Sequence, residues 1–122
     1  YNSWPLMGST YFPDDNKFIN LFNFSAFSDP SLMQFLHRNL AYVILGFYFI
    51  IMIKIYLNKL VSLYFAINLI GLFLVIQIIL GIFTLLYGAQ IFLASMHQIS
   101  SIFLVSSSVY FLYLNTNQQL SN

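Results

Sequence analysis

The side chains of this 122-residue chain best suited to chemistry are its two histidines, His37 and His97. Each falls near the start of a long apolar run, and one further apolar run separates the two. If each run is a helix, the first and third point the same way, and a rise of 1.5 Å per residue puts both histidines roughly 10 Å along them. Ionisable groups inside a membrane usually face a bundle interior or a functional cavity. We therefore predict that the two histidines share one site near the outer surface.

Two imidazoles at one depth are typical of a haem site. Neutral imidazole is a standard axial ligand of haem iron, and helix bundles commonly hold this cofactor. The small residues Ala41, Gly81 and Ala94 fall at the same level and are expected to leave room for a flat macrocycle. We interpret the pair as the axial ligands of a bis-histidine haem iron. Two alternatives remain: hydrogen bonding between helices, and another metal, for which two histidines without a nearby carboxylate or cysteine are poorly suited.

Four further polar side chains are candidate cofactor contacts: Arg38, Gln34, Gln77 and Gln98. Arg38 follows His37 and is expected either to pair with a haem propionate or to extend toward lipid headgroups. Glutamines inside membrane spans more often join helices by hydrogen bonds, which is the alternative for Gln77 and Gln98. The serines of the third run are expected to bond back to helix carbonyls. No residue is assigned a catalytic role, because no phosphate loop, nucleophile triad or HExxH pattern occurs.

The composition requires that these residues be positioned by membrane helices. The chain is 60% hydrophobic and only 6% charged, whereas soluble domains carry about 25% charged residues. This excludes a soluble enzyme core and a disordered tail, and a net charge of +1 offers no basic face for nucleic acid. The absence of cysteine excludes disulfide scaffolds, iron–sulfur clusters and thiolate sites. The fold class is therefore an all-α integral membrane protein in contact with lipid.

Three apolar runs are predicted to span the membrane, at residues 30–56, 60–87 and 91–114. Each exceeds the roughly 20 residues that a span requires. Asp29 and Pro30 are expected to begin the first helix as its N-cap and first turn, and Gly88 is expected to break the second. Residues 115–122 are predicted to be a polar tail.

The charges predict how the chain is oriented. Residues 1–29 form an outer-side loop with an expected amphipathic segment near Phe18–Phe27, and this loop holds all three aspartates. Lys54 and Lys59 bracket the turn between the first two spans, which the positive-inside rule places on the inner side. The histidine site would then lie near the outer face.

Four motifs in this order resemble the C-terminal half of the haem A synthase family. They are residues 1–7 (YNSWPLM), 33–42 (MQFLHRNLAY), 77–86 (QIILGIFTLL) and 94–98 (ASMHQ). The family oxidises haem O to haem A for cytochrome c oxidase and has two four-helix halves. The resemblance implies that His37 and His97 are the axial ligands of a haem b. It also implies that Gln34 stands where the catalytic N-terminal half has an essential glutamate.

By this resemblance, the three helices form most of a four-helix haem-binding bundle. We expect the missing helices, including the catalytic N-terminal half, to come from a separate membrane partner, or the chain to be a fragment. The expected location is the mitochondrial inner membrane or the bacterial plasma membrane, with the haem toward the intermembrane space or periplasm. The alternatives are a structural membrane subunit of a respiratory complex, or a plain electron-transfer cytochrome b.

Overall fold

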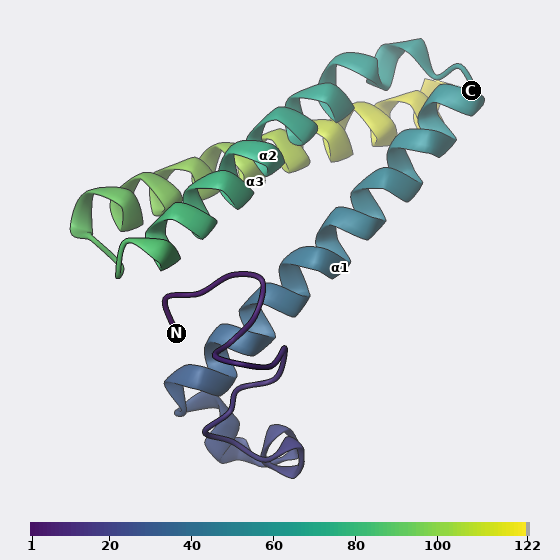
Figure 1. Ribbon diagram of the computed structural model, residues 1–122. Coiled ribbons are helices and arrows are strands. Elements are labelled where there is room, and N and C mark those ends of the chain that lie inside the picture. Colours follow the sequence, from purple (N-terminus) through teal and green to yellow (C-terminus); the bar gives the residue numbers. More distant parts are fainter. Residues whose placement is uncertain (122) are drawn as a thin grey trace.

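The computed structural model describes residues 1–121 and confirms an all-α membrane protein with three long helices (Figure 1). These are α1 (Pro30–Leu57), α2 (Tyr64–Leu86) and α3 (Ile91–Ser121). Three short 3-10 helices accompany them: η1 (Phe18–Phe22), η2 (Phe24–Phe27) and η3 (Val61–Leu63). The last residue of the predicted polar tail, Asn122, lies outside the described residues.

Local chemistry explains where the first two helices begin and end. The Asp29 side chain accepts hydrogen bonds from the backbone N–H groups of Ser31 and Leu32 at 2.9 and 3.0 Å, as predicted for an N-cap. The turn after α1 places Lys59 at φ 52°, and the turn after α2 places Gly88 at φ 69°. In each turn the next N–H reaches back across the helix end, as when Ala89 donates to the Thr84 carbonyl at 2.7 Å. Left-handed residues at this position terminate helices.

The third helix is longer than its hydropathy predicts. We expected it to end at Leu114, yet α3 continues to Ser121. Hydropathy reports where a helix leaves a membrane, whereas ending a helix requires a residue that interrupts its hydrogen bonds. The polar stretch from Asn115 contains neither glycine nor proline, so the helix continues through it.

The helices converge at one end of the molecule and separate toward the other. α2 and α3 form an antiparallel pair, and α1 meets them near the turn that joins α1 to α2 (Figure 1). A buried apolar cluster of Ile55, Leu63 and Ile67 lies at this junction, which we call the converged end. Side chains from all three helices pack around the cluster: Tyr48, Met52, Tyr64, Ile70, Phe111 and Leu114.

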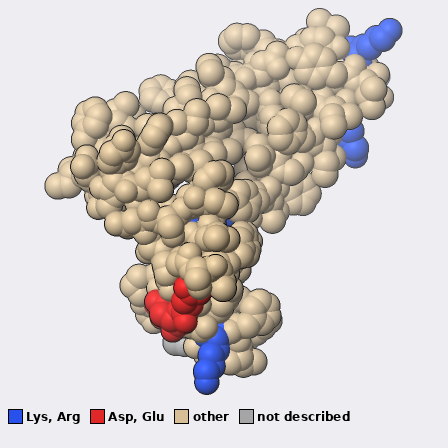
Figure 2. Space-filling model, in the orientation of Figure 1, with Lys and Arg blue, Asp and Glu red and all other residues tan. Residues whose placement is uncertain are grey.

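All three helices are long and apolar enough to cross a membrane. The candidate spans are Pro30–Leu57, Val61–Leu86 and Ile91–Asn117. The acidic side chains gather at the end that carries the N-terminal segment, and basic side chains lie at both ends of a wide uncharged surface (Figure 2). This distribution fits a protein whose middle is embedded in lipid.

Candidate functional site

The structure brings the two histidines together, as their matched depth predicts. The ring centroids of His37 on α1 and His97 on α3 are 6.2 Å apart, and the ring planes meet at 77°. His37 is exposed, whereas His97 is half-buried between α3 and α2. The contact joins α1 to α3 at the end opposite the apolar cluster, which we call the histidine end.

The two rings lie at the separation of a metal-bridged pair, but the edge of the His97 ring that holds Cε1 and both nitrogens faces Gly81 on α2. Nitrogens about 2 Å from a shared metal would put two imidazole centres roughly 6 Å apart, and the observed separation is 6.2 Å. Among the described residues no group of three or more His, Cys, Asp or Glu could hold a metal ion. The described residues therefore offer two histidines here and no complete metal-binding group of their own.

A polar side chain from α2 holds His97 in place. The Gln77 Nε2 atom lies 3.3 Å from His97 Nε2, and the Ser100 hydroxyl donates a short hydrogen bond to Gln77 Oε1. The Nε2 atom of Gln77 is an NH₂ group, which can only donate a hydrogen bond. His97 Nε2 is therefore the acceptor, and the proton of the neutral imidazole lies on Nδ1. Rotation of the Gln77 amide by 180° would instead place Oε1 next to the ring. Oε1 would then accept a hydrogen bond from the tautomer that is protonated on Nε2. Gln77 is thus an adaptable partner for one nitrogen of this ring.

The other ring nitrogen of His97 has no partner in the part of the chain that the structure describes. His97 Nδ1 is buried and lacks a hydrogen bond, although most buried polar atoms in proteins have one. A histidine that ligates a metal typically uses one nitrogen for the metal and has the other held by a neighbouring polar group. In His97 one nitrogen is held by Gln77, and the other is buried against Gly81 and carries the proton in this tautomer.

Gly81 allows the His97 ring to lie against α2. A Cβ atom at Gly81 would stand 3.0 Å from His97 Cε1, closer than ordinary van der Waals contact. The room that Gly81 leaves is thus used by the side chain of His97. A flat imidazole ring from the neighbouring helix already occupies that space.

Arg38 binds the N-terminal segment of its own chain. The residue is only 9% exposed. Nη2 donates to the Ser3 carbonyl at 2.8 Å, and Nη1 donates to the carbonyls of Pro5 and Leu6 at 3.3 Å. These loop carbonyls have no partner in a helix, so a multidentate cation satisfies them well. Both predicted roles of Arg38, pairing with a haem propionate and reaching lipid headgroups, require free Nη donors, whereas here these donors bind the protein's own loop.

Further contacts fasten the N-terminal segment across the histidine end. Gln34 Nε2 donates to the Tyr1 carbonyl at 2.9 Å, and Trp4 Nε1 donates to the Tyr42 hydroxyl at 3.2 Å. The Asn2 side chain reaches the α2–α3 turn, where it lies 3.6 Å from the position of a Cβ on Gly88. The segment thus bridges α1 and that turn, as its path in Figure 1 also shows.

Hydrogen bonds also order the exposed loop that follows. The Ser9 N–H and the Thr10 hydroxyl donate to the Asp14 carboxylate at 2.8 Å each, and these bonds lower the pKa of Asp14 below its ordinary value. The Ser31 hydroxyl donates to Asp15 at 2.7 Å and lowers the pKa of that carboxyl in the same way. Because the native loop favours the ionised form, acidification below about pH 4 should loosen it.

Two glutamines and one serine make other contacts than the sequence predicted. Gln98 is exposed on α3, and Gln34 serves the N-terminal segment; the structure brings neither to the histidine rings. Ser100, expected only to bond back to its helix, does so at 2.9 Å to the His97 carbonyl and also contacts Gln77. Its spacing of three residues from His97 was a signal for a shared helix face.

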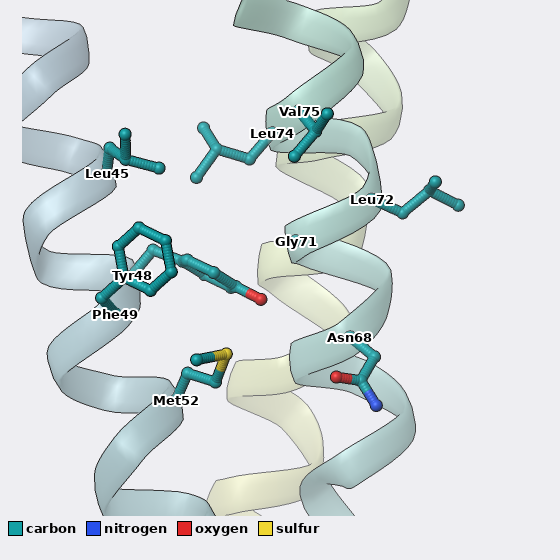
Figure 3. A pocket seen from close by; sticks show the side chains of 9 residues that line it. All are labelled: Leu45, Tyr48, Phe49, Met52, Asn68, Gly71, Leu72, Leu74 and Val75. Carbon is teal, nitrogen blue, oxygen red and sulfur yellow. The ribbon is translucent and has the colours of Figure 1, made fainter.

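The groove between α1 and α2 is separate from this site. It has a volume of about 330 Å³ and contains no histidine in its lining (Figure 3). Tyr48 extends across it from α1 toward Gly71, where a Cβ atom would overlap the tyrosine hydroxyl. The groove is lined mainly by apolar side chains: Leu45, Tyr48, Phe49, Met52, Asn68, Gly71, Leu72, Leu74 and Val75.

Comparison with known proteins gives a consistent result. Residues 1–109 match the model of a family described as cytochrome oxidase assembly protein. The chain is similar to haem A synthase of Pelagibacter ubique, with 41% identity over 96% of this chain and 34% of the relative. It is also similar to the haem A synthases of Rickettsia prowazekii, at 36% identity over 95% of this chain and 35% of the relative, and of Wolbachia pipientis, at 38% over 92% and 30%.

The matches cover only part of each relative. This chain spans about a third of the length of the relatives, and the matched region is their C-terminal part. No solved structure matches the chain.

Proposed function

Because this chain belongs to the family of cytochrome oxidase assembly proteins, we propose that it is the haem b-binding C-terminal part of a haem A synthase. His37 and His97 would be the axial ligands of the haem iron. The observation that carries this proposal is the contact between the chain's only two histidines, whose ring centroids are 6.2 Å apart across α1 and α3. When bound, the haem would supply one-electron redox chemistry.

The side chains around the pair have supporting roles in this proposal. Gln77, backed by Ser100, would orient the His97 ring and fix its tautomer. Arg38 and Gln34 would hold the N-terminal segment over the outer end of the site. No residue of the chain is assigned to proton transfer or nucleophilic attack.

The oxidation of haem O to haem A would then take place with the rest of the enzyme. We propose that a separate membrane polypeptide, or the remainder of a longer chain, contributes the other helices and the catalytic half. The relatives' greater length supports this. The membrane would be the mitochondrial inner membrane or the bacterial plasma membrane. The histidine end would face outward, since Lys54 and Lys59 belong to the opposite end.

An optical titration tests the ligand assignment. The chain, purified in detergent together with any membrane partner that co-purifies, is titrated with haem b, and we expect a low-spin b-type spectrum. His37→Ala and His97→Ala should each abolish that spectrum. Gln98→Ala is the matched control, because Gln98 adjoins His97 but is exposed, and it should leave the spectrum unchanged.

Other outcomes separate the alternatives. A low-spin spectrum that survives both alanine substitutions would overturn the ligand assignment. The absence of any haem binding would favour a structural subunit of a respiratory complex. Haem binding without oxidation of haem O in the partner complex would favour an electron-transfer cytochrome b. Haem retained with no membrane partner would count against the division of the enzyme between two polypeptides.

A further inference from the structure

The segment before α1 presents an unpartnered apolar surface. Large apolar side chains on η1 and η2 are between 63% and 95% exposed. We call this surface the aromatic face; it consists of Phe18, Ile19, Phe22, Phe24 and Phe27. Contiguous apolar patches of this kind on a protein surface usually mark a contact with a partner or a membrane.

The other side of the same segment is fixed to the protein. Asn20 Nδ2 donates to Asn16 Oδ1 at 3.2 Å, and Asn16 Nδ2 donates to the Asp29 carboxylate at 3.2 Å. Ala26 is fully buried. Asp29 is in turn the N-cap of α1, so these contacts tie the orientation of the segment to the start of that helix. The aromatic face is therefore held outward.

The aromatic face lies next to the start of the first membrane span. η2 ends at Phe27, and the first candidate membrane span begins at Pro30. No charged residue occurs between Lys17 and Asp29. The aromatic face thus lies immediately before the point where α1 enters the membrane, with only Ser28 and Asp29 between Phe27 and that helix.

We propose that the aromatic face lies in the interfacial layer of the lipid bilayer on the side where α1 begins. Amphipathic segments with one aromatic and apolar side bind at this depth, with that side in the acyl boundary. Lys17, at the edge of the face, is placed to meet lipid phosphate groups. Lipid is favoured over a protein partner because the face ends three residues before a membrane span begins, which holds it at the level of the bilayer surface. This proposal does not depend on haem binding.

A tryptophan probe tests this placement in phosphatidylcholine vesicles. The variant Trp4→Phe with Phe24→Trp carries a single tryptophan at the most exposed position of the face. We expect brominated acyl chains with bromine near the headgroup to reduce its fluorescence at least twofold, and aqueous iodide to have little effect. Trp4→Phe with Phe47→Trp, at an exposed site within α1, is the control and should respond most to bromine deep in the bilayer.

Two results would overturn the proposal. Quenching by iodide and not by brominated lipid would place the aromatic face in water. Quenching by neither, with the Phe47→Trp control still quenched by lipid, would show that protein covers the face, either another polypeptide or a second copy of this chain. The same pair of measurements on Phe22→Trp in the Trp4→Phe background checks that one substitution has not displaced the segment.

Discussion

At the converged end the three helices are joined by apolar packing, whereas at the histidine end a set of polar contacts adds to the apolar packing of α1 on the N-terminal segment. The converged end has the buried cluster of Ile55, Leu63 and Ile67. The histidine end has the hydrogen bonds of Arg38 to the N-terminal segment and the contact between the two histidine rings.

This difference follows from how apolar packing and hydrogen bonding act inside a lipid bilayer. Lipid tails are as apolar as leucine, so the converged end is held by close packing and gains little from burial itself. Polar groups at membrane depth have few alternative partners, so their hydrogen bonds fix one geometry. We infer that the converged end sets how the helices assemble and that the histidine end sets where the ligating groups stand.

Removing the charge of Arg38 should produce the largest effect at the histidine end. Arg38→Met leaves the carbonyls of Ser3 and Pro5 without a donor and Leu6 with only the Ser3 hydroxyl, and hydrogen bonds to charged groups contribute about 1.5–3 kcal/mol each. We expect the free energy of unfolding to fall by about 3 kcal/mol in detergent. Chymotrypsin should also cleave the N-terminal segment much faster. Thermal unfolding followed by circular dichroism, together with limited proteolysis, measures both effects.

A second charge removal on the same side of the molecule provides the control. Lys17→Met removes an exposed cation, and it should change neither the unfolding temperature nor the rate of cleavage. Native resistance to proteolysis in Arg38→Met would contradict the role of Arg38 as the anchor of this segment.

Truncating the apolar cluster should have a smaller effect, confined to the converged end. Ile67 is 2% exposed, and Ile67→Ala should lower the free energy of unfolding by about 2 kcal/mol, the lower limit for such changes. The N-terminal segment should keep its native resistance to chymotrypsin. Ile79→Ala, at a 47% exposed position of α2, should be nearly neutral. Equal losses in both variants would show that the cluster contributes no special packing.

The sequence predicted the converged end only in outline and the histidine end in part. Hydropathy located the three helices, and Asp29 and Gly88 marked helix ends because their side chains or conformations act locally. The end of α3 was missed, because hydropathy changes at Asn115 while the backbone has no reason to stop there.

The prediction that His37 and His97 meet is confirmed because the rise per residue of a helix determines how deep each side chain lies in the membrane. Spacing carries no information on a loop that folds back, so the binding of residues 1–6 by Arg38 and Gln34 could not be foreseen. The filling of the space beside Gly81 by the His97 ring depends on a side-chain rotamer that packing decides.

The smallest expected effect concerns the hydrogen bond that Gln77 makes to His97. Gln77→Leu removes the one hydrogen-bond partner that the His97 ring nitrogens have among the described residues, at a cost of about 1 kcal/mol. The imidazole should then shift from the Nδ1-protonated tautomer toward the other form. Labelling the histidines with 15N reports this shift directly, because the chain has only two.

The comparison with Gln98→Leu makes the tautomer measurement decisive. Gln98 is exposed and adjacent to His97, so its replacement should leave both histidine signals where they are. Ser100→Ala should move the His97 signal part of the way, because Ser100 contacts the Gln77 amide and not the ring. If Gln77→Leu leaves the His97 nitrogen shifts unchanged, Gln77 does not set the tautomer. The His97 ring would then be oriented by its packing against Gly81 alone, and the histidine end would resemble the converged end in depending on shape.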